Sequence, residues 1–323
     1  MTLSRSLPRT GFGLLGMTWR PKVTPDEQAF AAMKAAIAGG ATIWSSSSIY
    51  GMDPEPPTAG MWLLRRYFEK YPEDAPMVQL FIRACFDLVN FKPQTTRAGI
   101  RASYEECQAI LSEFKKTNVF GLARIEKEVP VEEIVGALKE LVEEGKIDAV
   151  GLSEVSARTL HRAAAAYQIA FMLTNGVADA CKQHGITILT YAPLGYGFLT
   201  GQVTKLEDIP KGDVRHMFGR FQPERWNFDK NLELVDKVKL IAKERGVTPA
   251  QLALAWIRSH SNQGNCGNII PIPGATAASR VEENCGIIEL SAAEKAALDA
   301  IITSIEIVGD RQIVGMSDEF LWT

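Results

Sequence analysis

The stretch NVFGLARIEKEVPVEEIVGALKELVEEGKIDAVGL, residues 118–152, contains the pattern on which the fold class depends. Its first six and last six residues are short runs rich in apolar side chains, as in buried strands. Between them, apolar residues recur at helical spacing from Val131 to Glu144. Pro130 opens this helix and Gly145 closes it. The stretch therefore predicts one strand–helix–strand unit.

The same alternation continues along the chain in both directions. The expected strands are 14–19, 41–45, 78–83, 118–123, 147–152, 168–173, 186–191 and 268–272. The expected helices are 25–37, 59–70, 96–115, 131–144, 157–166, 176–184, 229–245, 249–259, 277–284 and 292–303. Strands that are apolar on both faces belong to a parallel sheet covered by helices. Eight such units favour a closed α/β (β/α)8 TIM barrel, with an open doubly wound sheet as the alternative. No linker divides the chain, so residues 1–323 are expected to form a single domain.

Composition and charge exclude several classes of protein. The chain has a net charge of −3, and its basic residues are scattered, so no nucleic-acid partner is expected. The five cysteines form no CxxC pair, and the four histidines show no metal-ligand spacing, so no bound metal is expected. The N-terminus lacks a signal peptide, and no apolar run is long enough for a membrane span. These features predict a cytoplasmic protein without a membrane partner. They do not reveal its oligomeric state.

Two loops indicate a phosphate site. Residues 191–201 follow the seventh expected strand, and their three glycines would leave backbone amides open to a phosphate. Residues 271–280 follow the eighth strand and lead into a helix that carries Arg280. Loops seven and eight of a barrel often bind phosphates. Simple turn chemistry is the alternative for the glycines.

The chain resembles the aldo-keto reductases over nearly its full length. The segments that carry the resemblance are 11–19, 49–51, 138–146, 151–154, 191–194, 199–201, 271–274 and 280–284. Each segment is weak alone, but their common order is specific. Residues 151–156 and Ala123-Arg124 are most similar to the fungal pyridoxal-reductase-type branch.

The resemblance implies NADPH as the cofactor. The residues implied to hold it are Ser153, Leu194, Gly195, Gly197, Gly274, Arg280, Glu283 and Asn284. Arg280 would bind the ribose 2′-phosphate, which suits a guanidinium at a helix start. Ser153 would lie beside the nicotinamide carboxamide. A solvated helix residue is the alternative for Arg280.

The implied reaction is hydride transfer to a carbonyl, with a tyrosine as the proton donor. Tyr50 matches that tyrosine, which needs neighbours that tune it for work at neutral pH. The family uses a lysine, an aspartate and a histidine, but these positions fall at Arg83, Ser45 and Ala123. Arg83 keeps a positive charge that favours a phenolate. It cannot lose its proton, and its donors are placed differently from those of lysine.

The sixth unit also departs from the family pattern. The expected strand ends at Leu173, and a helix follows almost at once, so about ten residues of the family's loop are absent. The loop normally carries an aromatic that stacks on the nicotinamide. Divergence and a splicing error in the gene prediction are both open explanations.

Three functions follow from these observations. The first is an NADPH-dependent reductase of an aldehyde or ketone, either a pyridoxal-like aldehyde or a fungal secondary metabolite, with Tyr50 as acid and Arg83 in place of the lysine. Its substrate pocket is expected to include Trp19, Phe86, Arg124 and Trp226. The second is a catalytically impaired barrel that binds NADP(H) or a protein partner. A lyase or aldolase is disfavoured, because no lysine at a strand end is placed for a Schiff base.

Overall fold

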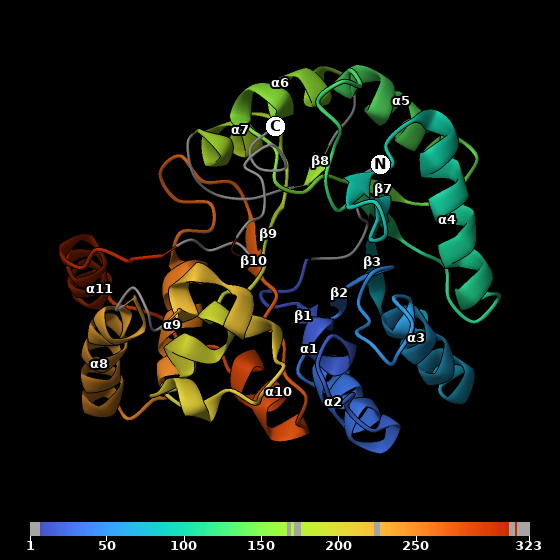
Figure 1. Ribbon diagram of the computed structural model, residues 1–323. Coiled ribbons are helices and arrows are strands. Elements are labelled where there is room, and N and C mark those ends of the chain that lie inside the picture. Colours follow the sequence, from blue (N-terminus) through green and yellow to red (C-terminus); the bar gives the residue numbers. More distant parts are fainter. Residues whose placement is uncertain (1–6, 167–168, 171–175, 223–226, 310–313, 315–323) are drawn as a thin grey trace.

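The computed structural model describes residues 7–166, 169–170, 176–222, 227–309 and 314. Its parallel strands gather at the centre of the molecule, and helices surround them (Figure 1). The fold is an α/β TIM barrel, as the alternation of strands and helices predicted. The loops after β9 and β10, which are predicted to bind a phosphate, therefore belong to one rim of a barrel.

The element bounds agree closely with the expected ranges in most units. The strands are β1 Phe12–Gly13, β2 Ile43–Ser47, β3 Gln79–Ala84, β4 Phe86–Asp87, β5 Lys92–Pro93, β6 Val119–Leu122, β7 Ala149–Gly151, β8 Ile169–Ala170, β9 Ile188–Thr190 and β10 Ile269–Pro271. The helices are α1 Leu15–Thr18, α2 Asp26–Ala38, α3 Ala59–Lys70, α4 Arg97–Leu111, α5 Val131–Glu143, α6 Ala157–Ala166, α7 Val177–Gln183, α8 Asn227–Arg245, α9 Pro249–Ser259, α10 Ala278–Cys285 and α11 Ala292–Ser304.

The strands follow one another in chain order around the barrel. One sheet has the order β1-β2-β3-β6-β7-β8, and β9 pairs with β10 in a second. A bridge between Gly13 and Gly274 joins the two sheets, supported by a bond of 2.9 Å from the Gly11 amide to the Pro271 carbonyl. The ladder thus continues from β9 through β10 and β1 to β8. Residues 171–175, which follow β8, lie outside the described residues.

The interior of the barrel is filled by apolar side chains at its centre. Phe81 packs there with Ile43 and Ile270. A Cβ placed on Gly151 would lie 2.7 Å from the Phe81 ring, so only a glycine fits beside this ring. The filled centre is a packed core and not a pore, and the room for ligands lies at the rim above it.

Local sequence explains how the outer helices begin and face the sheet. In α5, Pro130 stands before the first helical residue, and the helix ends before Gly145, whose φ is +70°. Its side chains at helical spacing are buried against the sheet: Val131, Ile134, Val135, Leu138 and Leu141. The same spacing therefore predicted both the helix and its buried face.

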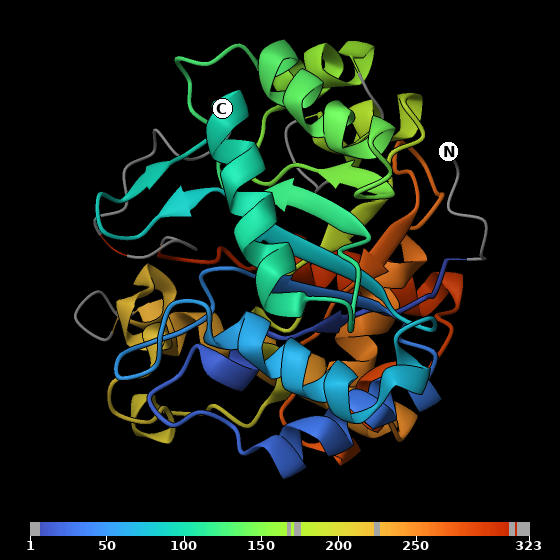
Figure 2. The ribbon, with the colours of Figure 1, turned by 90° about the vertical axis from the view of Figure 1, so that its right-hand side faces the viewer.

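Two features of the first half of the barrel differ from the prediction. The expected strand 14–19 is wrong, because β1 lies at Phe12–Gly13 and Leu15–Thr18 form the short helix α1. Phe12 and Gly13 pair with β2, and Leu14 already turns away. After β3 the chain forms an antiparallel hairpin, β4–β5, which projects from the barrel (Figure 2). No local pattern distinguished these short pairings.

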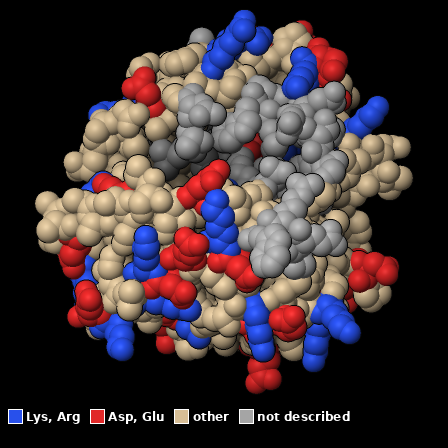
Figure 3. All heavy atoms as spheres, turned by 60° about the vertical axis from the view of Figure 1, so that its left-hand side comes forward, with Lys and Arg blue, Asp and Glu red and all other residues tan. Residues whose placement is uncertain are grey.

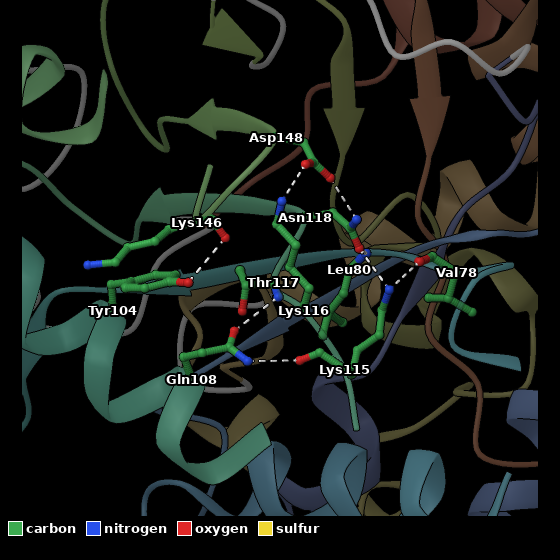
Figure 4. Close-up of polar contacts among 10 residues, drawn as sticks. All are labelled: Val78, Leu80, Tyr104, Gln108, Lys115, Lys116, Thr117, Asn118, Lys146 and Asp148. Carbon is green, nitrogen blue, oxygen red and sulfur yellow. Dashed lines mark hydrogen bonds and ion pairs between the residues drawn. The ribbon is translucent and has the colours of Figure 1, made fainter. Parts of the chain in front are cut away.

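A cluster of polar groups lies at the other rim of the barrel, where the strands have their amino ends (Figure 4). Lys115 is buried and donates hydrogen bonds to the carbonyls of Ala75 and Val78, at 2.9 and 2.7 Å, and to Asn118 Oδ1 at 2.9 Å. Asn118 donates in turn to Asp148 at 2.8 Å. Burial lowers the pKa of Lys115 to about 8. The cluster ties β3, β6 and β7 together at their starts.

The outer surface carries intermingled charges of both signs, as one face shows (Figure 3). Ion pairs on the surface include Lys230 of α8 with Glu306, which follows α11, at 2.9 Å and Lys295 with Asp299 within α11 at 2.7 Å. None of the helices in the described ranges is both long enough and apolar enough to cross a membrane.

Candidate active site

Two adjoining cavities lie at the rim formed by the carboxyl ends of the strands, where barrel enzymes bind their substrates. The larger, of about 390 Å³, reaches from Ser45 to α10 and is called the long cavity below. The smaller, of about 170 Å³, is lined by residues that follow β3, β6 and β7 and is called the chamber. Tyr50 and Arg83 line both cavities. The two cavities therefore meet at these two side chains.

The loop after β2 holds Tyr50 in place. Its backbone carbonyl accepts a hydrogen bond of 2.6 Å from Thr18 Oγ1 and one of 3.0 Å from the Gly60 amide. Its ring packs against Trp19, with the ring centres 5.6 Å apart. Only 5% of Tyr50 is exposed. The predicted proton donor is thus fixed in a largely dry site, where electrostatic interactions are strong.

Arg83 reaches Tyr50 from the neighbouring strand, β3. Its Nη2 donates a hydrogen bond to the Tyr50 hydroxyl oxygen, and its Cζ lies 5.6 Å from the centre of the tyrosine ring. Its Nε is buried and has no hydrogen-bond partner among the described residues. Within the described part of the chain, no carboxylate forms an ion pair with Arg83. The structure brings the predicted pair together and leaves the guanidinium charge uncompensated there.

Ser45, at the position of the family's aspartate, does not join this pair. It lies on β2, lines the long cavity and is 2% exposed. Its hydroxyl is buried and has no hydrogen-bond partner among the described residues. Ser45 therefore does not orient Arg83 through a hydrogen bond.

Helix α10 brings three of the residues predicted to hold the cofactor to the far end of the long cavity. Arg280, Glu283 and Asn284 all line it. Arg280 Nη1 pairs with Glu283 Oε2 at 2.6 Å, and about half of the Arg280 side chain is exposed. The side-chain amide of Gln202 lies beside the same guanidinium, within hydrogen-bond distance of both terminal nitrogens. Arg280 is thus accessible and surrounded by exchangeable polar partners.

A buried arginine supports α10 from behind. Arg258 of α9 donates from Nη2 to the Asn284 carbonyl at 2.9 Å and to Thr10 Oγ1 at 2.6 Å. It also donates to the Gly286 carbonyl at 3.4 Å. These carbonyls end α10, where a cation is favourable. Burial lowers the pKa of Arg258 to about 10, so the group is still charged at neutral pH.

The glycine loop after β9 differs from its prediction. Leu194 and Gly197 line the long cavity, but Gly195 is not among the lining residues. The Gly195 and Gly197 amides donate to the carbonyls of Ala192 and Leu194, at 2.9 and 3.1 Å. The expectation that these two amides are open to a phosphate is therefore wrong in this structure. The glycines serve a tight turn, since their φ angles are +57° and +94°.

Two further predicted cofactor residues lie at the rim. Ser153 follows β7 and lines the chamber, and its hydroxyl is buried without a partner among the described residues. Gly274 follows β10 and lines the long cavity, where a Cβ would lie 3.1 Å from the Gly13 carbonyl oxygen. An unsatisfied buried hydroxyl beside a cavity is a group that a bound ligand can satisfy.

The chamber contains three of the four predicted pocket residues. Trp19, Phe86 and Arg124 all line it. Trp226 lies outside the described residues. Further apolar walls come from Leu88, Phe91, Tyr196, Val214 and Phe218. The chamber is therefore largely apolar, with its charged groups contributed by the ends of β3, β6 and β7.

Glu154 and Tyr191 are site residues to which the sequence assigned no role. Glu154 lines the chamber, is 4% exposed, and accepts a hydrogen bond of 2.8 Å from the Tyr191 hydroxyl. Its φ is +57°, a strained value for a residue with a side chain, and such strain gathers at functional sites. Their position directly after β7 and β9 was the available signal.

A second ion pair borders the long cavity. Arg215 donates to both carboxylate oxygens of Asp213, at 2.8 and 2.9 Å, and to the Tyr196 carbonyl at 3.3 Å. Burial opposes ionisation of Asp213, but the bonds from Arg215 hold its pKa below the usual value. The pair therefore contributes no net charge to the cavity wall.

Known proteins match this chain over most of its length. The sequence profile of the Aldo/keto reductase family matches residues 9–303. The "Probable pyridoxal reductase 2" of Schizosaccharomyces pombe is 36% identical over 296 residues, 87% of this chain and 86% of the relative. The "Aldo-keto reductase yakc" of the same organism, whose name specifies NADP(+), is 33% identical over 327 residues, 95% of this chain and 92% of the relative. Among solved structures, a glycerol dehydrogenase from Gluconobacter oxydans has a TM-score of 0.76 at 20% identity and covers 98% of this chain and 96% of that one.

Proposed function

The chain belongs to the aldo/keto reductase family and is therefore an oxidoreductase by family, and we propose that it reduces an aldehyde or ketone with NADPH. The observation that carries the proposal is the hydrogen bond between Arg83 and the Tyr50 hydroxyl, at the point where the two cavities meet. In this proposal Tyr50 is the proton donor and Arg83 its cationic partner, and both lie where the long cavity meets the chamber.

The residues present fit a nicotinamide dinucleotide. The long cavity extends from the Tyr50–Arg83 pair to Arg280, so one elongated molecule can contact both ends. Arg280 is accessible for a 2′-phosphate, with Glu283 and Asn284 beside it. Ser153 has an unsatisfied hydroxyl near the other end. When bound, NADPH supplies the hydride that the carbonyl carbon receives.

The chain's own residues supply the proton and the charge. The Tyr50 hydroxyl gives its proton to the carbonyl oxygen as that oxygen becomes an alcohol. The phenolate left on Tyr50 is stabilised by the hydrogen bond and the positive charge of Arg83. Arg83 keeps its own proton throughout, so Tyr50 is reprotonated from solvent or through another group.

The chamber supports a substrate with an aromatic or other apolar body. Phe86, Phe91 and Phe218 line it, and Trp19 lies beside Tyr50. The name of the 36% identical relative specifies pyridoxal, an aromatic aldehyde. We therefore propose a pyridoxal-like aldehyde or a fungal secondary metabolite as the substrate. The proposed location of the protein is the cytoplasm.

The second candidate is a catalytically impaired barrel that binds NADP(H) or a protein partner. The unpartnered Ser45 hydroxyl and Arg83 Nε favour it, because nothing among the described residues fixes the guanidinium besides Tyr50. A positioning error near 1 Å can cost about 100-fold in rate.

An NADPH titration followed by turnover on a panel of aldehydes distinguishes the two. The proposed reductase binds NADPH and consumes it with at least one aldehyde. The protein is an impaired barrel if it binds NADPH without turnover and if the double substitution Arg83→Lys with Ser45→Asp does not restore turnover. Absence of NADPH binding would overturn the cofactor proposal as well.

A further inference from the structure

We propose that the chamber selects carbonyl substrates that carry a negatively charged oxygen next to the carbonyl group, and that Arg83 binds this oxygen. The inference rests on the proposed function, because it assumes that the substrate carbonyl lies at the Tyr50 hydroxyl. It assigns Arg83 a direct contact with substrate in addition to its bond to Tyr50.

Arg83 carries a positive charge that no carboxylate among the described residues compensates. Its recorded polar contact is the single bond from Nη2 to Tyr50, and Nη1 has no partner within the described part of the chain. By contrast, two other arginines of the long cavity are paired with carboxylates: Arg215 with Asp213 and Arg280 with Glu283. A partly buried guanidinium without a counter-ion is costly, and an anionic ligand removes that cost.

Tyr50 and Arg83 present their polar groups at the same place in the site. The Tyr50 hydroxyl and the terminal nitrogens of Arg83 are hydrogen-bonded neighbours, so they face the same junction of the cavities. A guanidinium is planar and presents its donors in a fork that matches two nearby oxygens. With the carbonyl oxygen at Tyr50, we expect a second oxygen on the neighbouring carbon, or on the ring carbon ortho to an aldehyde, to lie within reach of Arg83.

The surroundings of the chamber direct the anion to this place. Glu154 carries a carboxylate that already accepts a bond from Tyr191, and it disfavours a second negative charge near itself. Arg124, the other cation of the chamber, donates from Nη1 to the Ala123 carbonyl at 2.6 Å, and apolar side chains such as Phe86 and Phe218 form most of the remaining wall. The substrate is therefore expected to have an apolar body with its negative charge beside the reacting carbonyl.

Two kinds of compound share this chemistry. In a 2-oxo acid the charged oxygen belongs to a carboxylate next to the ketone. In a 2-hydroxyaryl aldehyde it belongs to an ionised ring hydroxyl beside the aldehyde, as in pyridoxal. The charged oxygen lies on the neighbouring carbon in the 2-oxo acid and on the ortho ring carbon in the aldehyde, so both compounds hold it close to the carbonyl oxygen, and matched pairs of compounds separate them.

The first measurement compares matched substrates with the wild-type protein. 2-Hydroxybenzaldehyde is compared with 3-hydroxybenzaldehyde at a pH at which the 2-hydroxyl is ionised, and benzoylformate with its methyl ester, by kcat/KM with NADPH. We expect the compound with the adjacent anion to be preferred by about tenfold or more in at least one pair. The pair that shows the preference identifies the source of the anion. Turnover without a preference in either pair would overturn the inference and leave the proposed function intact.

The second measurement does not depend on turnover. Binding of benzoylformate, its methyl ester and the two hydroxybenzaldehydes is followed by calorimetry, with NADP+ and without it. We expect Arg83→Met to remove the preference for the adjacent anion, and Arg83→Lys to keep part of it. The matched control is Arg124→Met, because Arg124 lines the same chamber at the end of the next strand. A preference that survives Arg83→Met, or follows Arg124, contradicts the inference, as does equal binding by the wild-type protein.

Discussion

The guanidinium of Arg83 donates a hydrogen bond to the hydroxyl oxygen of Tyr50, although the two residues are 33 positions apart in the chain. Each side chain belongs to a different unit of the barrel, and both line the two cavities that meet between them. In the proposed reaction, this permanent cation supports the charge left on Tyr50 when its proton is given away. The pair replaces the lysine-based arrangement that the family resemblance implied.

Replacing Tyr50 by phenylalanine tests the proton donor. Tyr50→Phe is expected to lower kcat by about 10²- to 10⁴-fold, because general acid catalysis is lost. NADPH affinity is expected to change little, since Arg280 is at the far end of the long cavity. The control is Tyr104→Phe, whose hydroxyl bonds to the Lys146 carbonyl at 3.1 Å, away from the site. Equal rates for Tyr50→Phe and the wild type would remove Tyr50 from the mechanism.

Arg280 tests the cofactor phosphate. Arg280→Met is expected to weaken NADPH binding by about tenfold or more, because a charge-assisted contact with the 2′-phosphate is lost. NADH has no 2′-phosphate, so its affinity serves as the internal control. Fluorescence titrations with both cofactors make the comparison. Equal weakening of both would indicate that Arg280 supports the helix and not the phosphate.

Arg258 is a positioning residue for the cofactor site. Arg258→Met removes its bonds to the Asn284 carbonyl and Thr10 Oγ1, so it is expected to lower the free energy of unfolding by about 1–3 kcal/mol and to raise the KM for NADPH more than it lowers kcat. Arg258→Lys is expected to recover part of both effects. The matched control is Arg65→Met, since Arg65 also donates to a carbonyl, that of Ile110 at 3.1 Å, but on the outer helices. An unchanged KM for NADPH in Arg258→Met would show that the bonds from Arg258 to the end of α10 do not affect cofactor binding.

Lys115 is expected to make stability depend on pH. Its pKa is about 8 in the folded protein and near 10.5 when unfolded, so between these values the unfolded state binds more protons. The free energy of unfolding therefore rises by about 2–3 kcal/mol from pH 8 to pH 10.5 through this group alone. Below pH 8 the contribution is constant. Denaturant unfolding of the wild type and Lys115→Met at several pH values isolates the effect, with Lys116→Met as the control. Parallel pH profiles for wild type and Lys115→Met would refute it.

Gly151 tests the packing of the barrel interior. Gly151→Ala is expected to lower the free energy of unfolding by about 1–3 kcal/mol, because its methyl group meets the Phe81 ring at 2.7 Å. In a Phe81→Leu background the additional cost of Gly151→Ala is expected to shrink. Gly136→Ala is the control, since nothing lies within 4 Å of a Cβ placed there, in the middle of α5. Additive effects of the two core substitutions would contradict direct contact.

Much of the architecture could be predicted from local pattern. The bounds of α3 and α6 agree with the expected ranges, and α5 differs by one residue. Helical spacing, a proline at a helix start and a glycine at its end act within a few residues, so the sequence displays them directly. The short strand β1 could not be predicted in this way, because its two residues become a strand only through pairing with β2 and the bridge from Gly13 to Gly274, which follows β10.

The sequence by itself determined the alternation of strands and helices, and it predicted the rim for the site and singled out Tyr50, Arg83 and Arg280 as candidate site residues. Only the tertiary structure decided that Arg83 contacts Tyr50, that Ser45 does not contact Arg83, and that the Gly195 and Gly197 amides are already bonded within their turn. The physical reason is range. Periodicity and capping depend on neighbours in the chain, whereas hydrogen bonds between loops depend on how the closed barrel brings distant segments together.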